Sequence, residues 1–255
     1  MGIDVMTETT QSQSPAIELD ALCHSYGDTE VLRNIDLRIE HGEIFGFLGH
    51  NGAGKTTAVN ILTTLIAPTA GTARVCGFDV ATERHEVTSR IGYLPADVRM
   101  YPHLTARENV EFFAKLSGIA KPSAAVDETF EYLSCSDLAD KRVGSFSTGM
   151  RQRVGIAQAI VHRPQVLFLD EPTSGLDPVG VRQLRETIIR LNADLGMTVF
   201  MNTHLLSEVA KVCTTIGVLD HGEPIYKDTI AATTERFPDE TSLEDIYVRM
   251  ERSAP

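Results

Sequence analysis

The chain has 255 residues, of which 42% are hydrophobic and 23% are charged. This size and composition are typical of one large globular domain or two small ones, and they exclude a globally disordered chain. The 35 acidic residues outnumber the 23 basic ones, and the net charge of −12 argues against broad nonspecific DNA binding, which needs clustered Lys and Arg.

The first part of the chain is predicted to be rich in strands. Residues 1–15 are polar and lack periodicity, which indicates a disordered tail. Alternating or continuous apolar residues then predict short strands over residues 16–22, 31–39, 43–48, 72–76 and 91–94. One helix is expected among them, from about residue 55 to residue 66, where Pro68 stops it.

The pattern changes after Pro95 and becomes mostly helical up to about residue 162. Strand-like segments return over residues 166–169, 198–202 and 216–219, with a helix over 178–195 and two short helices after residue 226. Strand–helix alternation with a helical insertion predicts an α/β sheet that carries an all-helical subdomain. We therefore expect these parts: a tail over 1–15, a core over 16–95 and 165–225, a helical subdomain over 96–164 and an extension over 226–255.

A glycine-rich segment over residues 49–57 reads GHNGAGKTT and fits the phosphate-loop pattern G-x-x-x-x-G-K-[ST] between a strand and a helix. Glycines let successive backbone N–H groups face a phosphate, and the helix N-terminus adds positive partial charge. Lys55 suits the β- and γ-phosphates, and the Thr56 hydroxyl suits Mg²⁺. The alternative is a glycine turn that fits by chance. The expected nucleotide-binding residues are Gly49, His50, Asn51, Gly52, Ala53, Gly54, Lys55, Thr56 and Thr57.

Two adjacent carboxylates end the apolar run VLFLDE over residues 166–171. In a parallel sheet the functional edge lies at the carboxyl ends of the strands, which would place Asp170 beside the phosphate loop as a ligand of Mg²⁺. Glu171 is then the candidate general base for an attacking water. The alternative is a strand that ends in a helix-capping Asp.

Four scattered cysteines without a CxxC pair predict a reduced, intracellular chain. No apolar run approaches the length of a membrane span, and the start of the chain lacks the features of a secretory signal. We expect a soluble or peripheral protein.

The segments FSTGM, RQRVGIAQAIVHRP and VLFLDEPTSGLDP follow one another from Phe146 to Pro178. In this order they resemble the ATP-binding-cassette (ABC) family, and the resemblance extends from about Ala16 to Leu219. It implies a P-loop NTPase (RecA-like) core with N-terminal antiparallel strands, which binds ATP and Mg²⁺ and hydrolyses the ATP. It also implies a second copy or a homologous cassette as partner, with two ATP molecules between them.

The resemblance assigns further residues by position. Tyr26 matches the aromatic that stacks on adenine, and His204 matches the histidine that contacts the γ-phosphate. A core tyrosine and a surface or capping histidine are the alternatives. The signature that closes over the partner's ATP matches Ser147, Thr148, Gly149 and Met150, of which Ser147 suits an ordinary helix N-cap as well. The D-loop at the dimer interface matches Ser174, Gly175, Leu176 and Asp177.

Two features depart from the family pattern. Ala96 stands where the family usually has Gln, and alanine cannot hydrogen-bond through its side chain. Either the loop backbone and Asp97 suffice, or hydrolysis is slow and loosely coupled. In the signature, Phe146, Thr148 and Met150 replace Leu, Gly and Gln, but STGMRQR is similar to cassettes that serve separate export permeases for drugs, sodium or polysaccharides.

The leading interpretation is therefore the ATPase subunit of an exporter, on the cytoplasmic face of the membrane, with a separate permease and no nucleic acid partner. Its cargo and the identity of the permease stay open. Three alternatives remain open from the sequence: a soluble cassette ATPase in translation or DNA maintenance, a metabolic P-loop kinase, and a cassette for nitrous oxide reductase maturation, which is indicated only by His50.

Overall fold

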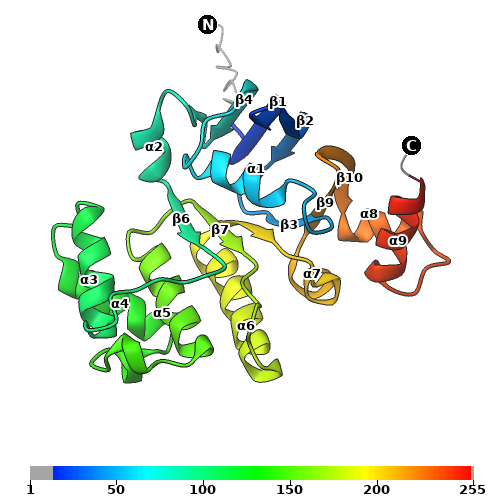
Figure 1. Cartoon of the computed structure of the whole chain (residues 1–255). Helices are drawn as coiled ribbons and strands as arrows, with labels where there is room; N and C mark the ends of the chain where they lie inside the picture. The colour runs from blue at the N-terminus through cyan, green and yellow to red at the C-terminus, as the bar shows by residue number, and fades with distance from the viewer. Residues whose placement is uncertain (1–13, 254–255) are drawn as a thin grey trace, which may run out of the picture.

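The computed structural model describes residues 14–253 (Figure 1). The predicted tail lies outside the described residues except for its last two, and Pro15 is already buried. The strands are β1 Ile17–Tyr26, β2 Thr29–Ile39, β3 Ile44–Leu48, β4 Ala70–Val75, β5 Phe78–Asp79, β6 Ile91–Leu94, β7 Val166–Asp170, β8 Thr198–Asn202, β9 Thr215–Asp220 and β10 Glu223–Thr229. The α-helices are α1 Lys55–Leu62, α2 Arg84–Thr88, α3 Ala106–Leu116, α4 Pro122–Tyr132, α5 Thr148–Ile160, α6 Pro178–Leu195, α7 Leu206–Val212, α8 Ile230–Arg236 and α9 Leu243–Ser253. Two 3₁₀ turns, Ser136–Leu138 and Val143–Ser145, lie between α4 and α5.

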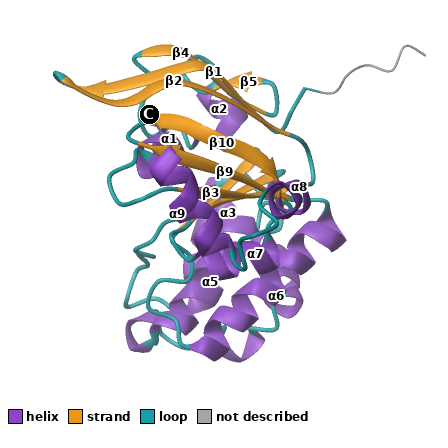
Figure 2. Ribbon diagram, turned by 90° about the vertical axis from the view of Figure 1, so that its right-hand side faces the viewer, coloured by secondary structure: helices purple, strands orange, loops and turns teal. Residues whose placement is uncertain are grey.

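The strands form two sheets that lie in separate layers (Figure 2). The larger sheet has the order β10-β9-β3-β8-β7-β6, with parallel pairing from β9 to β6 and antiparallel pairing of β10 with β9. The smaller sheet, β2-β1-β4-β5, is antiparallel. The helices α3, α4 and α5 lie between β6 and β7 in the sequence. This is the α/β core with N-terminal antiparallel strands and a helical insertion that the sequence predicts.

The larger sheet is buried on both faces, which explains why its central strands read as continuous apolar runs. Side chains alternate between the faces along each strand. Along β3, Phe45 and Phe47 enter the core shared with α1 and the smaller sheet, whereas Ile44 and Leu48 enter the core shared with the helices. Phe200 packs against both phenylalanines, with ring centroids 5.4 and 5.3 Å apart. The parallel strands are thereby fixed in register.

Several elements have the predicted bounds, and others differ. The strands β6 and β8 and the helix α6 begin and end where the sequence predicts. The first helix ends at Leu62 instead of residue 66, because the chain turns at Thr64, whose φ is 64°.

A larger difference concerns residues 226–229, which we expected in the C-terminal extension. They belong to β10, because Tyr226 and Thr229 pair with Val218 and Thr215 of β9. The two expected short helices, α8 and α9, follow this strand. Within residues 14–253, no helix has both the length and the apolar character needed to cross a membrane.

Candidate nucleotide site

The glycine-rich loop connects β3 to α1, as its sequence pattern predicts. Gly52 and Gly54 have φ values of 90° and 106°, a conformation that glycine adopts most readily. A side chain at Gly54 would also meet the Val31 carbonyl oxygen at 2.9 Å. The N-terminus of α1 has no side-chain cap, so its free N–H groups are available to a phosphate.

Lys55 begins α1 and is only 6% exposed. Its Nζ donates to the carbonyl oxygens of Gly49, at 2.5 Å, and His50, at 3.0 Å. Burial lowers the pKa of Lys55, and the carboxylates of Glu171 and Asp170 oppose this shift by favouring the charged form. The lysine thus connects the phosphate loop electrostatically to the end of β7.

Asp170 ends β7 and pairs in register with Asn202 at the end of β8. The Asn202 side-chain amide donates to Asp170 Oδ1 at 2.5 Å. Burial raises the pKa of Asp170, while this hydrogen bond lowers it. The parallel register therefore fixes the direction of the carboxylate at the edge of the sheet.

Glu171 follows directly and has a φ of 46°, which is uncommon for a residue other than glycine. Its backbone N–H donates to the Asn202 carbonyl at 2.8 Å. Its Oε2 lies 2.8 Å from Nδ1 of His204, which follows β8. The structure thus brings the predicted pair Glu171 and His204 into direct contact at the carboxyl edge of the sheet.

Tyr26 lies at the end of β1, and it is 51% exposed instead of belonging to the core. The ring of the buried His24 contacts it edge to face, with centroids 4.6 Å apart. An exposed aromatic ring that a neighbour holds in place is suited to stacking on a planar base.

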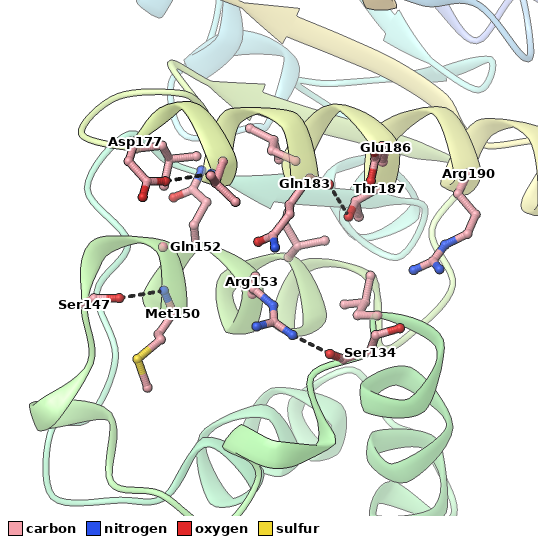
Figure 3. A pocket seen from close by; sticks show the side chains of 17 residues that line it. Ser134, Ser147, Met150, Gln152, Arg153, Asp177, Gln183, Glu186, Thr187 and Arg190 are labelled. Atoms are coloured by element: carbon pink, nitrogen blue, oxygen red, sulfur yellow. Dashed lines mark hydrogen bonds between the residues drawn. The ribbon is translucent and has the colours of Figure 1, made fainter.

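The signature and D-loop residues form a second group, beside a groove of about 530 Å³ between α5 and α6 (Figure 3). Ser147 Oγ caps α5 by accepting from the Met150 N–H at 3.3 Å, and Asp177 Oδ1 caps α6 by accepting from the Gly180 N–H at 2.7 Å. A Cβ atom at Gly175 would lie 3.3 Å from Thr148, so the two segments touch.

Two residues of these groups were not predicted from the sequence. Asn202 orients Asp170, and its position at the end of a strand beside β7 is the signal that indicates it. Gln152 is buried on α5 and donates to the Pro172 carbonyl at 2.6 Å, which connects the signature helix to the segment after the acidic strand. Nothing in the local pattern of α5 marks Gln152, because only the folded chain brings Pro172 to it.

Comparison with known proteins is consistent with this geometry. The family model of the ABC transporter matches residues 32–174, more than half of the chain. The bacitracin transport ATP-binding protein BcrA of Bacillus licheniformis is 39% identical over 82% of this chain and 68% of its own length. The daunorubicin resistance ATP-binding protein DrrA3 of Streptomyces coeruleorubidus is 39% identical over 84% of this chain and 68% of its own length.

Solved structures show the same fold. An ATP-binding subunit of an ABC transporter superposes with a TM-score of 0.83 and 25% identity, covering 92% of this chain and 99% of that one. A dimeric bacterial ABC transporter cassette gives a TM-score of 0.75 and 27% identity, over 84% and 98% of the two chains. These similarities do not favour the translation, DNA or nitrous oxide reductase alternatives. The chain belongs to the ABC transporter family, as an ATP-binding and ATP-hydrolysing subunit.

Proposed function

We propose that two cassettes of this kind enclose two ATP molecules and that their hydrolysis drives a separate permease that exports its cargo. The observation that carries the proposal is the contact between Glu171 and His204 at the sheet edge that faces the phosphate loop, where Glu171 Oε2 lies 2.8 Å from His204 Nδ1. Export is supported by the names of the relatives, which include bacitracin transport, linearmycin resistance and daunorubicin resistance proteins.

The residues of the phosphate loop suit the triphosphate of ATP. The free N–H groups at the start of α1 and the Lys55 ammonium provide donors and positive charge where phosphate oxygens would lie. Phosphate oxygens can replace the carbonyl partners of Lys55 Nζ. Tyr26 would stack on the adenine.

The residues at the edge of β7 also suit Mg²⁺. Thr56 is exposed at the start of α1. Asp170 provides a carboxylate, and its burial raises the pKa of this group. A divalent cation favours the ionised form and so offsets this cost of burial. Thr56 and Asp170 would hold the ion, which neutralises phosphate charge when it is bound.

Glu171 acts as the general base in this proposal. It accepts a proton from the water whose oxygen bonds to the γ-phosphorus, while the bond between that phosphorus and the bridging oxygen breaks and ADP leaves. Nδ1 of His204 holds the Glu171 carboxylate, and its exposed ring leaves the other nitrogen available to the γ-phosphate.

The second group of residues acts on the partner's ATP. Ser147 and Gly149 lie at the N-terminus of α5, where a hydroxyl and free N–H groups suit an anion. The adjacent D-loop residues at the start of α6 would lie across the interface between the two cassettes.

The permease would contact the helical subdomain and hold the chain at the cytoplasmic face of the membrane. Tyr101 and Phe112 are exposed, and their rings meet edge to face with centroids 5.3 Å apart. The Asn109 side chain fixes the backbone of Tyr101 with two hydrogen bonds. The Tyr101 N–H donates to Asn109 Oδ1 at 2.8 Å, and Asn109 Nδ2 donates to the Tyr101 carbonyl oxygen at 3.2 Å. This exposed aromatic pair on a fixed backbone suits a coupling segment of another protein.

The test is the ATPase rate of Glu171→Gln, with Glu131→Gln, an exposed carboxylate on α4, as the matched control. We expect Glu171→Gln to bind ATP but hydrolyse it about 10²–10⁴-fold more slowly, the range in which a general base contributes. Glu131→Gln should hydrolyse at the wild-type rate. Full turnover by Glu171→Gln would remove Glu171 from the role of base.

A further inference from the structure

The hairpin turn between β9 and β10 lies against the phosphate loop. The turn places His221 and Gly222 at φ values of 45° and 84°. The Gly222 N–H donates to the Ala53 carbonyl at 3.0 Å, and the Arg33 N–H donates to the Gly222 carbonyl at 2.8 Å. The tip of the hairpin is thus hydrogen-bonded on both sides, which fixes its position beside the loop.

This contact brings two histidines and a carboxylate together. His50 Nε2 lies 3.1 Å from Asp220 Oδ1, and His221 Nδ1 lies 2.8 Å from the same oxygen. The two imidazole rings are 4.7 Å apart between centroids. One ring nitrogen from each histidine and a carboxylate oxygen of Asp220 all lie within 4.8 Å of one another.

The two ring nitrogens of His50 have different surroundings. Its Nδ1 lies 2.8 Å from the Asn51 carbonyl oxygen, which only accepts, so Nδ1 is the donor in this hydrogen bond. Nε2 is buried, makes no well-aligned hydrogen bond, and faces Asp220 Oδ1 at 3.1 Å. Either a proton on Nε2 or a metal ion shared by Nε2 and the carboxylate oxygen would satisfy this contact.

The donor set indicates which cation fits. Two imidazoles and one carboxylate suit Zn²⁺ and similar transition metals, whereas Mg²⁺ and Ca²⁺ prefer oxygen ligands alone. Bonds of about 2.0–2.2 Å in a tetrahedral site place ligand atoms about 3.4 Å apart. Asp220 Oδ1 lies 3.1 Å from His50 Nε2 and 2.8 Å from His221 Nδ1, so the side chains need to move only slightly to reach this spacing. Metal-binding histidines usually donate their other ring N–H to a carboxylate or a backbone carbonyl. The contact of His50 Nδ1 with the Asn51 carbonyl oxygen is of this kind.

We propose that His50, Asp220 and His221 form a binding site for a divalent transition-metal ion such as Zn²⁺, which uses residues other than those proposed for Mg²⁺. A bound ion joins the hairpin tip to the first residues of the phosphate loop. The site is a property of the folded chain without nucleotide, so its test does not depend on the proposed transport function.

The experiment titrates the nucleotide-free full chain with Co²⁺, followed by visible absorption, and then displaces the Co²⁺ with Zn²⁺. Nucleotide is left out because ATP itself binds these ions. The main variant is His221→Asn, since Asn tolerates the left-handed backbone of the turn. The matched control is His85→Asn, which removes an exposed histidine on α2.

We expect one tight ion per chain, with the d–d absorption of cobalt in a nitrogen and oxygen environment. His221→Asn and Asp220→Asn should each weaken binding at least about tenfold, and His85→Asn should bind as the wild type does. Excess Mg²⁺ should not displace the ion. The proposal is overturned by equal affinities in His221→Asn and His85→Asn, by the absence of tight binding, or by a sulfur-to-cobalt charge-transfer band, which would place the metal on cysteine.

Discussion

Glu171 has a backbone conformation that a residue other than glycine rarely adopts, with a φ of 46°. Such a residue carries a strain of about 1–3 kcal/mol, and the surrounding structure must hold it in place. Here the Glu171 N–H donates to Asn202, and the Glu171 carbonyl accepts from Ser174 at 3.0 Å. The strained turn directs the carboxylate toward His204, which is the geometry that the proposed base requires.

Asp170 provides a prediction on pH dependence. Burial raises its pKa, so the folded protein binds the Asp170 proton more tightly than the unfolded chain, and the free energy of unfolding falls as the pH rises above about 4. Asp170→Asn removes the titrating group, so the free energy of unfolding no longer falls with pH at this site. The Asn side chain keeps an oxygen that can accept the hydrogen bond from the Asn202 amide. We expect the nucleotide-free variant to melt at a higher temperature than the wild type at pH 8, with a smaller difference at pH 4. A lower melting temperature of Asp170→Asn at both pH values would contradict this account.

Ala96 tests whether the loop after β6 works without the glutamine that the family usually has. Ala96 is exposed. The neighbouring Asp97 carboxylate forms an ion pair with Arg99 at 2.9 Å, and this exposed pair contributes little to stability. If the loop backbone and Asp97 suffice without a glutamine, Ala96→Gln should change the ATPase rate less than Glu171→Gln does. A rise of tenfold or more in Ala96→Gln would show instead that hydrolysis is limited by the missing amide.

At the scale of elements, the residue that caps the N-terminus of α5 has two proposed roles. Ser147 caps the helix, and its hydroxyl would also contact the partner's ATP. Replacing an N-cap serine by alanine costs about 0.5–2 kcal/mol of stability, whereas glycine costs only a few tenths. We expect Ser147→Ala and Ser147→Gly to lose ATPase activity to a similar degree. Urea unfolding should show a clear loss of stability in the alanine variant only.

The matched control is Thr229→Ala, which removes the N-cap of α8, where Thr229 accepts from the Ala232 N–H at 3.1 Å. This variant should lose comparable stability and keep its ATPase activity. If activity instead followed stability across the three variants, Ser147 would be a cap alone.

The sequence predicts the elements whose local pattern is decisive. The strands β6 and β8 are short apolar runs in a buried parallel sheet, and α6 has an aspartate cap and a proline at its start. The strand β10 has no such pattern, since its side chains are mostly exposed and pairing with β9 alone defines it. The contacts of the site depend on folding in the same way, because Asn202, Gln152 and the hairpin tip reach their partners only across elements distant in the sequence.

At the scale of the whole molecule, the predicted residues form two groups on different elements. The phosphate loop, Asp170, Glu171 and His204 lie at the edge of the larger sheet, whereas the signature and the D-loop lie beside the groove between α5 and α6. A second copy that turns its α5 toward the phosphate loop would complete both sites at once. If ATP binds tightly only in this closed pair, it would provide the difference in affinity that a change of shape needs.

The proposed role in export is tested most directly by purifying a tagged Glu171→Gln chain from its native cells, in detergent and with ATP. We expect two copies of a cassette together with a multi-spanning membrane protein in stoichiometric amount. Recovery of ribosomes, nucleic acid or soluble proteins alone would contradict it and would assign the ATPase to a process away from the membrane.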